Sequence, residues 1–171
     1  KKIKWFDNIP IISFLLLNGK CRSCKKKILP QYLIVEFITA LGFLLIFLNY
    51  ENFLISLLLS IFFLAYLIIF FIDLKHFIIP DILNYGIIVL ALTKNFLPNL
   101  DGIFIQNIIQ SIIGGIIGYF SIWIIIYLYR TFKKMEGMGL GDAKLMAGIG
   151  LLFGWQSIPL VLFLSAILGL F

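Results

Sequence analysis

The chain has 171 residues, of which 62% are hydrophobic and 13% are charged. A soluble domain is about half apolar and about a quarter charged, so this composition excludes a water-soluble fold, and the high apolar content also excludes disorder. The net charge of +6 is unevenly spread, because eight of the fourteen Lys and Arg residues lie in residues 1–27 and none lies in residues 28–72. That clustering is typical of a membrane protein with a basic cytoplasmic segment. A nucleic-acid-binding protein should instead line one folded face with cations.

Residues 1–32 are predicted to form a basic segment in the cytoplasm or at the membrane interface, against anionic lipid. They hold the two cysteines of the chain, Cys21 and Cys24. The Cys-x-x-Cys spacing fits a redox pair, half of a zinc site, or two thiols without a special role. Because a structural zinc site needs a complete tetrahedral ligand set, residue content favours half a zinc site whose partner ligands are absent from this chain. The chain starts at Lys1 without a signal peptide and ends in an apolar run, so we expect both ends to be truncated.

Residues 33–171 alternate long apolar stretches with short polar turns. A helix that spans a bilayer needs about 20 residues, so this length has room for about six spans. We therefore predict an all-α fold, in which residues 33–171 form a polytopic transmembrane helix bundle. The apolar stretches are residues 33–48, 53–72, 77–97, 103–129, 139–155 and 158–171.

The loop charges predict one orientation in the membrane. Cations lie before the first stretch, after the second at Lys75, and in the loop 130–134 after the fourth, whereas the turns at 49–52 and 98–102 have none. By the positive-inside rule, the loops with cations are cytoplasmic. Lys94, near the far end of the third stretch, is the exception, and we expect its ammonium to snorkel toward the membrane surface.

Five ionisable residues lie within or beside the apolar stretches, where a charge costs roughly 2.5–3.5 kcal/mol. In the predicted topology Asp73 ends the second stretch and Asp142 begins the fifth, so the two lie at one depth and can meet across a helix interface. Two carboxylates in a poorly solvated pocket share a proton, so one can accept a proton from water while the other donates to a carbonyl oxygen, as in an aspartic protease. On the residues alone, helix capping or exposure to the cytoplasm explains them equally well. The five residues are Glu36, Asp73, Asp81, Asp142 and Lys144.

Glycines in front of Asp142 permit close approach of another backbone, or they serve helix packing. Residues 139–146, with the sequence GLGDAKLM, resemble the GxGD motif of the type IV prepilin leader peptidases, which are bacterial intramembrane aspartic endopeptidases. Residues 72–81, with the sequence IDLKHFIIPD, resemble the first aspartate motif of that family. Further motifs, similar to its cysteine-containing region and the entry into the next helix, lie at 7–13, 19–24 and 31–36.

The resemblance implies that Asp73 and Asp142 are the catalytic pair, with Asp81 as the competitor for the first role. Asp73 is favoured because Asp81 follows Pro80 at a helix start, where a carboxylate has a capping role. The residues expected to support the site are Gly139, Gly141, Lys144, Glu36 and Asp81.

The resemblance also implies a substrate, which is a type IV prepilin or a type II secretion pseudopilin with a basic leader and a hydrophobic helix. The leader would be removed at the cytoplasmic face of the bacterial inner membrane, without a cofactor. N-methylation of the new N-terminus with S-adenosylmethionine is implied for the intact protein. One departure is that most family members carry a second Cys-x-x-Cys pair. No nucleic-acid partner is expected.

Two other functions stay open on the residues alone. An ion-coupled membrane transporter would use the intramembrane carboxylates and Lys144 as a proton relay. Against it, the charges cluster at the cytoplasmic edge and no repeated half is visible. A non-catalytic membrane scaffold would use the glycines for packing only, and its function would survive Asp73→Asn and Asp142→Asn.

Overall fold

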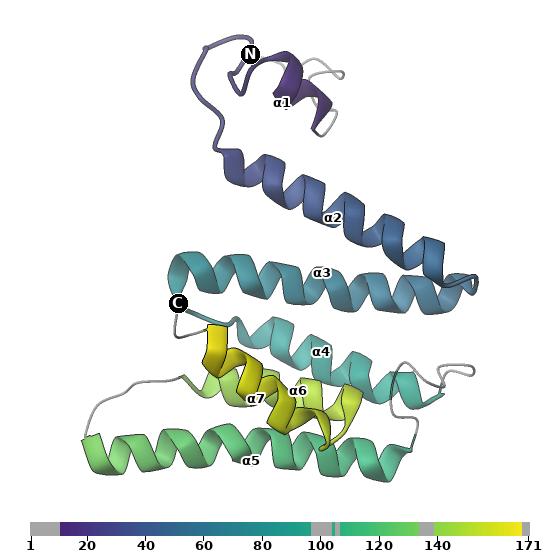
Figure 1. Ribbon diagram of the computed structural model, residues 1–171, viewed down its shortest axis with the longest axis vertical. Helices are drawn as coiled ribbons and strands as arrows, with labels where there is room; N and C mark the ends of the chain where they lie inside the picture. The colour runs from purple at the N-terminus through teal and green to yellow at the C-terminus, as the bar shows by residue number, and fades with distance from the viewer. Residues whose placement is uncertain (1–10, 97–103, 105–106, 134–138, 169–171) are drawn as a thin grey trace. The chain divides into compact units, whose positions relative to one another are not determined.

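The computed structural model describes residues 11–96, 104, 107–133 and 139–168. In these residues the regular structure is helical, apart from one antiparallel bridge between Lys20 and Lys27 (Figure 1), so the predicted all-α fold is confirmed. The elements are α1 (Ile12–Leu16), α2 (Pro30–Asn49), α3 (Phe53–His76), α4 (Asp81–Thr93), η2 (Lys94–Phe96), α5 (Ile108–Lys133), α6 (Leu140–Phe153) and α7 (Ser157–Leu168).

Some predictions fall on parts of the chain outside the described residues. They concern residues 1–10, which include the first part of the motif at 7–13, the turn at 98–102, the adjoining ends of the third and fourth stretches (97, 103, 105 and 106), residues 134–138 of the basic loop, and residues 169–171 of the last stretch. The chain divides into two compact units, residues 1–64 and residues 65–171, each of which is considered by itself.

The unit of residues 1–64 contains α1, α2 and the first half of α3. α2 begins at Pro30, whose missing N–H and fixed φ suit the first position of a helix. α3 begins after Asn52, whose Oδ1 accepts a hydrogen bond from the Leu54 amide at 3.0 Å, as an N-cap side chain does. The backbone turn between α1 and α2 carries Cys21 and Cys24, which form no disulfide.

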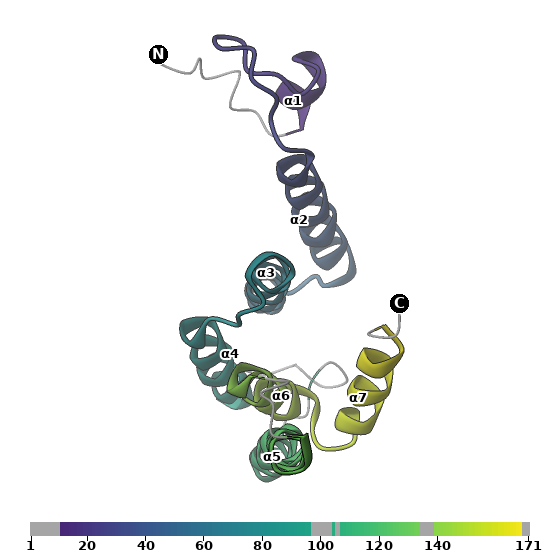
Figure 2. The ribbon, with the colours of Figure 1, turned by 90° about the vertical axis from the view of Figure 1, so that its left-hand side faces the viewer.

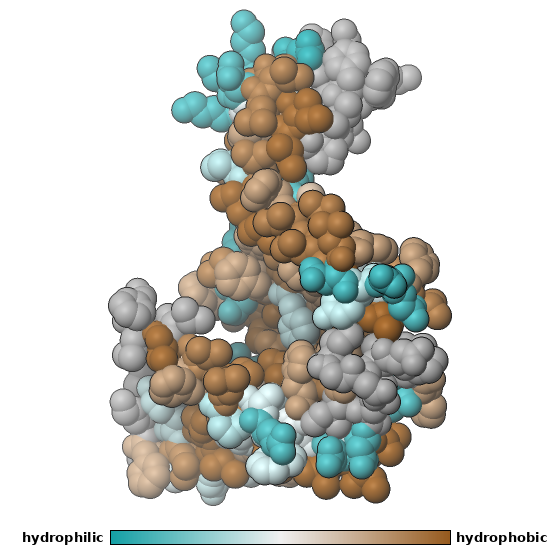
Figure 3. Space-filling view, turned by 45° about the vertical axis from the view of Figure 1, so that its right-hand side comes forward, coloured by the Kyte–Doolittle hydropathy of each residue, from teal (hydrophilic) through white to brown (hydrophobic). Residues whose placement is uncertain are grey.

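Among the described residues, three helices, α2, α3 and α5, are long and apolar enough to cross a membrane. The other expected spans correspond to the shorter helices α4 with η2, α6 and α7. The third stretch becomes helical at Asp81 rather than at residue 77, because Pro80 has an extended backbone with φ −64° and ψ 128°. Hydrophobic side chains cover much of the visible helix surface (Figure 3), as expected of a multi-pass membrane protein.

The unit of residues 65–171 is built around α6, which packs against α5, α4 and α7 (Figure 2). The closest approach joins Gly114 of α5 to Gly150 of α6, because a Cβ on either residue would collide with the carbonyl oxygen of the other. Small residues of this kind let helix backbones come together in lipid, where van der Waals packing drives association. The packing of α6 on α4 then brings the first turns of these two helices together.

Lys94 does not snorkel, so that prediction is wrong. Its side chain is 1% exposed, and its ammonium donates hydrogen bonds to Ser111 Oγ at 3.0 Å and to Asn95 Oδ1 at 3.3 Å. These acceptors come from η2 and from the first turn of α5. A lysine with polar partners inside the protein does not need to reach the membrane surface.

Candidate active site

A pocket of about 520 Å³ lies where α3 ends and where α4 and α6 begin. All of its residues belong to the unit of residues 65–171. They combine three carboxylates and one ammonium with apolar side chains and two glycines: Asp73, Phe77, Ile78, Ile79, Pro80, Asp81, Gly139, Leu140, Gly141, Asp142 and Lys144.

The end of α3 places Asp73 at this pocket. The backbone of Phe77 turns into the left-handed region, with φ 54°, and its amide donates a hydrogen bond to the carbonyl oxygen of Asp73 at 2.8 Å. This is the usual closing bond of a helix C-terminus, although a glycine normally occupies the left-handed position. The turn leads the chain along the pocket to Asp81, in the first turn of α4, where a carboxylate interacts favourably with the helix dipole.

The start of α6 places Asp142 in the same pocket. Gly139 has an extended backbone, the helix starts at Leu140, and the amide of Asp142 donates to the carbonyl oxygen of Gly139 at 3.2 Å. Asp142 is half-buried, whereas Asp73 is exposed, and the two carboxyl groups are near enough to interact electrostatically. Two like charges in one partly enclosed pocket repel each other, and a shared proton relieves that repulsion.

Asp81 is engaged by a different partner. Its Oδ1 accepts a hydrogen bond from Lys144 Nζ at 2.6 Å, in an ion pair whose side chains are 59% and 22% exposed. The same ammonium lies 5.1 Å from the centre of the Tyr85 ring, a cation–π distance. Sequence reasoning missed Tyr85, although its spacing of four residues from Asp81 puts both on one face of α4. Of the two candidates for the first catalytic role, Asp81 is therefore the one that pairs with Lys144, and Asp73 is the one that does not.

The two glycines of the motif are packed differently. A Cβ on Gly141 would lie 3.1 Å from Cβ of Ile79, in the connection that leads to α4. A Cβ on Gly139 would have its nearest neighbours at 3.8 Å and 3.9 Å, which is ordinary contact. Close packing therefore favours a glycine at position 141 but places no such demand on position 139.

Asn84 is a second residue that sequence reasoning missed at this site. It lies in α4, it is 1% exposed, and its Nδ2 donates a hydrogen bond to the carbonyl oxygen of Gly141 at 3.2 Å. The sequence could have indicated this residue, because Asn84 is a polar residue three positions after Asp81 in a largely apolar stretch.

Glu36 and the cysteines belong to the unit of residues 1–64. Glu36 Oε2 accepts a hydrogen bond from the Ile11 amide at 2.8 Å, which ties α2 to the segment that begins α1. Within the described residues, no three His, Cys, Asp or Glu side chains come together in a group that could hold a metal ion. Cys21 and Cys24 by themselves do not make up a zinc ligand set, so zinc binding stays a prediction that needs ligands from elsewhere.

A family model described as the Type IV leader peptidase family matches residues 58–171, and one described as the Bacterial Peptidase A24 N-terminal domain matches residues 1–50. Similar curated proteins carry the name prepilin leader peptidase/N-methyltransferase. The chain is 36% identical to the one from Dichelobacter nodosus over 99% of its own length and 57% of that protein. It is 35% identical to the one from Vibrio cholerae, with 98% and 64% covered, and 36% identical to the one from Neisseria gonorrhoeae, with 98% and 57% covered. The chain thus spans between 57% and 64% of the length of these three relatives, and no solved structure matches it.

Proposed function

Because the chain belongs to the type IV leader peptidase family, we propose that it is an intramembrane aspartic endopeptidase whose catalytic residues are Asp73 and Asp142. The supporting observation is that one pocket is lined by both carboxylates while the third, Asp81, is paired with Lys144. The substrates are type IV prepilins or type II secretion pseudopilins, and the reaction removes their basic leader. The intact protein carries out this activity, and the chain supplies the pocket for it.

In the proposed reaction, the two carboxyl groups share one proton and hold a water molecule between them. The ionised group accepts a proton from the water as its oxygen attacks the carbonyl carbon of the scissile bond, while the protonated group donates its proton to the carbonyl oxygen. The tetrahedral intermediate then breaks at the C–N bond: one carboxyl group donates a proton to the departing amine nitrogen, while the other carboxylate accepts a proton from a hydroxyl of the intermediate, which forms the product acid and restores the single shared proton. The sum is one water consumed and one peptide bond hydrolysed.

The pocket lies at the cytoplasmic face of the bacterial inner membrane in this proposal. The positive-inside rule assigns the loop after α3, with Lys75, to the cytoplasm. A basic leader stays on that side for the same reason, so its junction with the hydrophobic segment lies at the depth of the pocket. The carboxylates of Asp73 and Asp81, both exposed, complement the positive charge of the leader.

The other predicted site residues have supporting roles. Gly141 lets the connection before α4 pack against the motif, while Gly139, which close packing does not require, leaves room for an extended substrate backbone. Lys144 keeps Asp81 in an ion pair and so outside the reacting pair. Glu36 holds the segment that precedes the cysteines within the unit of residues 1–64, and its supporting role at the site stays a prediction from the family resemblance.

N-methylation of the new N-terminus from S-adenosylmethionine belongs to the proposal for the intact protein. The similar curated proteins are named for both activities, whereas the chain covers only part of their length. No described residue is assigned to S-adenosylmethionine, and no step of the proteolytic mechanism depends on it.

The proposal is tested with full-length protein purified in detergent and a purified prepilin, by following release of the leader. Asp73→Asn and Asp142→Asn should each abolish cleavage, because an amide can neither accept nor donate the shared proton. Asp81→Asn should reduce the rate without abolishing it. Glu51→Gln is the matched control, since this carboxylate lies in the turn between α2 and α3 and should leave the rate unchanged.

Cleavage at the wild-type rate by folded Asp73→Asn or Asp142→Asn protein would overturn the assignment. Complete loss of activity in Asp81→Asn, with activity retained in Asp73→Asn, would exchange the roles of these two residues. Size-exclusion chromatography and circular dichroism of each variant separate loss of chemistry from loss of fold.

A further inference from the structure

Asn84 connects α4 to the motif that carries Asp142. The amide Nδ2 donates its hydrogen bond to the carbonyl oxygen of Gly141, 57 positions later in the chain. Gly141 directly precedes Asp142, and the two share one peptide plane. This hydrogen bond therefore restrains the orientation of the backbone from which the Asp142 side chain projects.

The environment of Asn84 makes this bond more than an incidental contact. The side chain is 1% exposed, so the amide has given up water, which is costly unless a partner replaces it. Its Oδ1 has no hydrogen-bond partner among the described residues. Among the described residues, the side-chain amide of Asn84 thus makes one hydrogen bond, and its acceptor lies in the Gly-x-Gly-Asp turn. For packing alone, an apolar side chain of the same size would serve this position with less desolvation.

Gly141 is held from a second direction by Ile79. The close approach of 3.1 Å between Cβ of Ile79 and the place of a Cβ on Gly141 leaves little freedom on that side. Ile79 follows Asp73 by six residues in the connection from α3 to α4. The turn before Asp142 is therefore located between the connection that follows Asp73 and the amide of Asn84.

We propose that Asn84 is a positioning residue, which acts through the carbonyl oxygen of Gly141 to keep the Asp142 carboxyl group facing Asp73. The inference rests on the proposed function, because it gives the hydrogen bond a purpose only if these two carboxyl groups react together. Asn84 is not among the residues that line the pocket, so it does not touch the substrate. Its removal should lower the rate of the chemical step and leave substrate binding nearly unchanged.

The test compares variants of the full-length protein with a prepilin substrate. Asn84→Leu keeps the approximate volume and removes the donor. Asn84→Asp keeps the shape and turns an oxygen toward the Gly141 carbonyl. For both, kcat should fall by about tenfold to a hundredfold while KM stays within about twofold of wild type, as expected when a contact positions a reacting group. Asn84→Asp also answers the question if Asn84→Leu is not recovered in folded form.

The matched control is Ile87→Ala. Ile87 is as deeply buried, lies one turn further along α4, and packs against Gly148 of α6. This substitution loosens the same pair of helices without touching the motif, so it should lower stability but leave kcat per folded molecule near wild type.

The outcomes separate this inference from the proposed function. If Asp73→Asn and Asp142→Asn are inactive but both Asn84 variants keep the wild-type kcat, the positioning role is wrong and the catalytic pair stands. If Ile87→Ala loses as much kcat as Asn84→Leu, the amide only packs the helices and the inference is also wrong. If the Asp variants themselves cleave normally, the catalytic pair and the positioning role fall together.

Discussion

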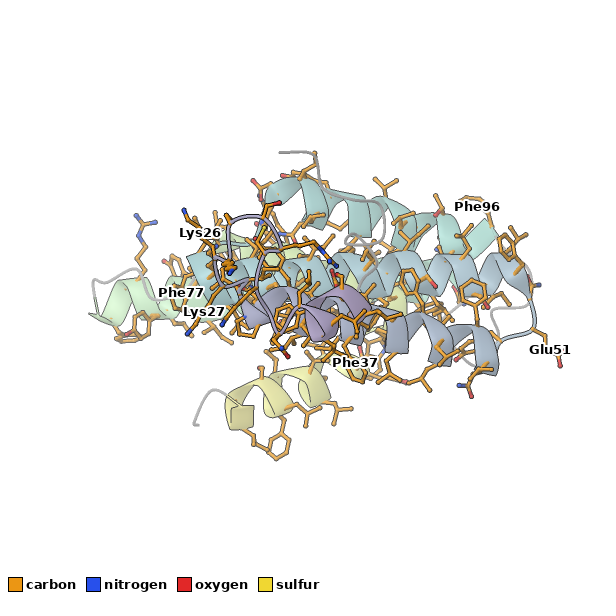
Figure 4. The ribbon with its side chains drawn as sticks, turned by 90° about the horizontal axis from the view of Figure 1, so that it is seen from above. Lys26, Lys27, Phe37, Glu51, Phe77 and Phe96 are labelled. Atoms are coloured by element: carbon orange, nitrogen blue, oxygen red, sulfur yellow. The ribbon has the colours of Figure 1, made fainter. Side chains whose placement is uncertain are left out.

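The two ends of α4 use charged side chains in opposite ways. At the first end, Asp81 and Lys144 form their ion pair in a partly enclosed pocket that Asp73 and Asp142 also line. At the other end, Lys94 is buried with Ser111 and Asn95. Phe77, in the connection from α3 to α4, and Phe96, in η2 just after α4, have exposed side chains and are labelled in Figure 4.

In the unit of residues 65–171, the reactive carboxylates thus lie at one end of α4, and the buried polar side chains that stabilise helix packing lie at the other. In the partly enclosed pocket, water still reaches the exposed carboxylates of Asp73 and Asp81, so their charge is available for chemistry at little cost to the fold. A buried ammonium has lost its hydration, and the free-energy cost of that loss is offset only by the acceptors that surround it. Substitutions at the pocket end should therefore change activity, and substitutions at the Lys94 end should change stability.

The largest expected effect is that of Asp142→Asn on cleavage. The rate should fall by about 1,000-fold or more, which corresponds to about 4 kcal/mol of transition-state free energy. The free energy of unfolding should not fall, because the change removes a charge that interacts with that of Asp73. Cleavage kinetics and chemical unfolding of the same preparation in detergent micelles check both statements. A clear fall in the free energy of unfolding would contradict the view that the pocket end of α4 serves activity rather than stability.

The next effect is that of Lys94→Met on stability. Methionine keeps the approximate length of the side chain but removes the buried ammonium that donates to Ser111 Oγ and Asn95 Oδ1, so the free energy of unfolding should fall by about 1–3 kcal/mol. Cleavage per folded molecule should stay at the wild-type level. The measurement is chemical unfolding combined with activity normalised to folded protein, and an unchanged unfolding midpoint would contradict the anchoring role.

Lys144→Met, the same substitution at the pocket end, should lower the cleavage rate and leave stability nearly unchanged. Asp81 would lose its cation and add an unpaired carboxylate to the pocket, which should slow cleavage by about tenfold, on the scale of other supporting contacts. The unfolding midpoint should not change measurably, because the ion pair is partly exposed. Lys75→Met, at the end of α3, is a control for the loss of one cation near the pocket. Equal rates for the two variants would remove the special role of Lys144.

The smallest expected effect is a gain in stability. Phe77 and Phe96 are 87% and 80% exposed, but only Phe77 has a left-handed backbone. Phe77→Gly should raise the free energy of unfolding by about 0.5–1 kcal/mol, because glycine adopts this conformation without the side-chain penalty. Phe96→Gly removes the same ring from a helical backbone and should lower the free energy of unfolding slightly. Thermal unfolding of the two variants side by side gives the comparison, and a loss for Phe77→Gly would contradict it.

The sequence by itself determined the class of molecule and the rough position of the site. Its apolar stretches predicted helices in a membrane because lipid offers no partner for unpaired backbone groups. Their alternation with charged loops predicted one level for Asp73 and Asp142, and both line one pocket, together with Asp81. Periodicity and composition are local properties, and the helices and the level of these two carboxylates follow from them, whereas their assignment to one site follows from the resemblance of the motifs to the family.

Only the tertiary structure decided which polar groups meet. The ion pair of Asp81 with Lys144 joins residues 63 positions apart, and the hydrogen bond of Asn84 to Gly141 joins residues 57 positions apart. Lys94 was expected at the membrane surface and lies instead beside Ser111 of α5. Such contacts depend on how α4, α5 and α6 pack, because the free energy of a buried polar group is set by its neighbours in space rather than by its neighbours in the chain.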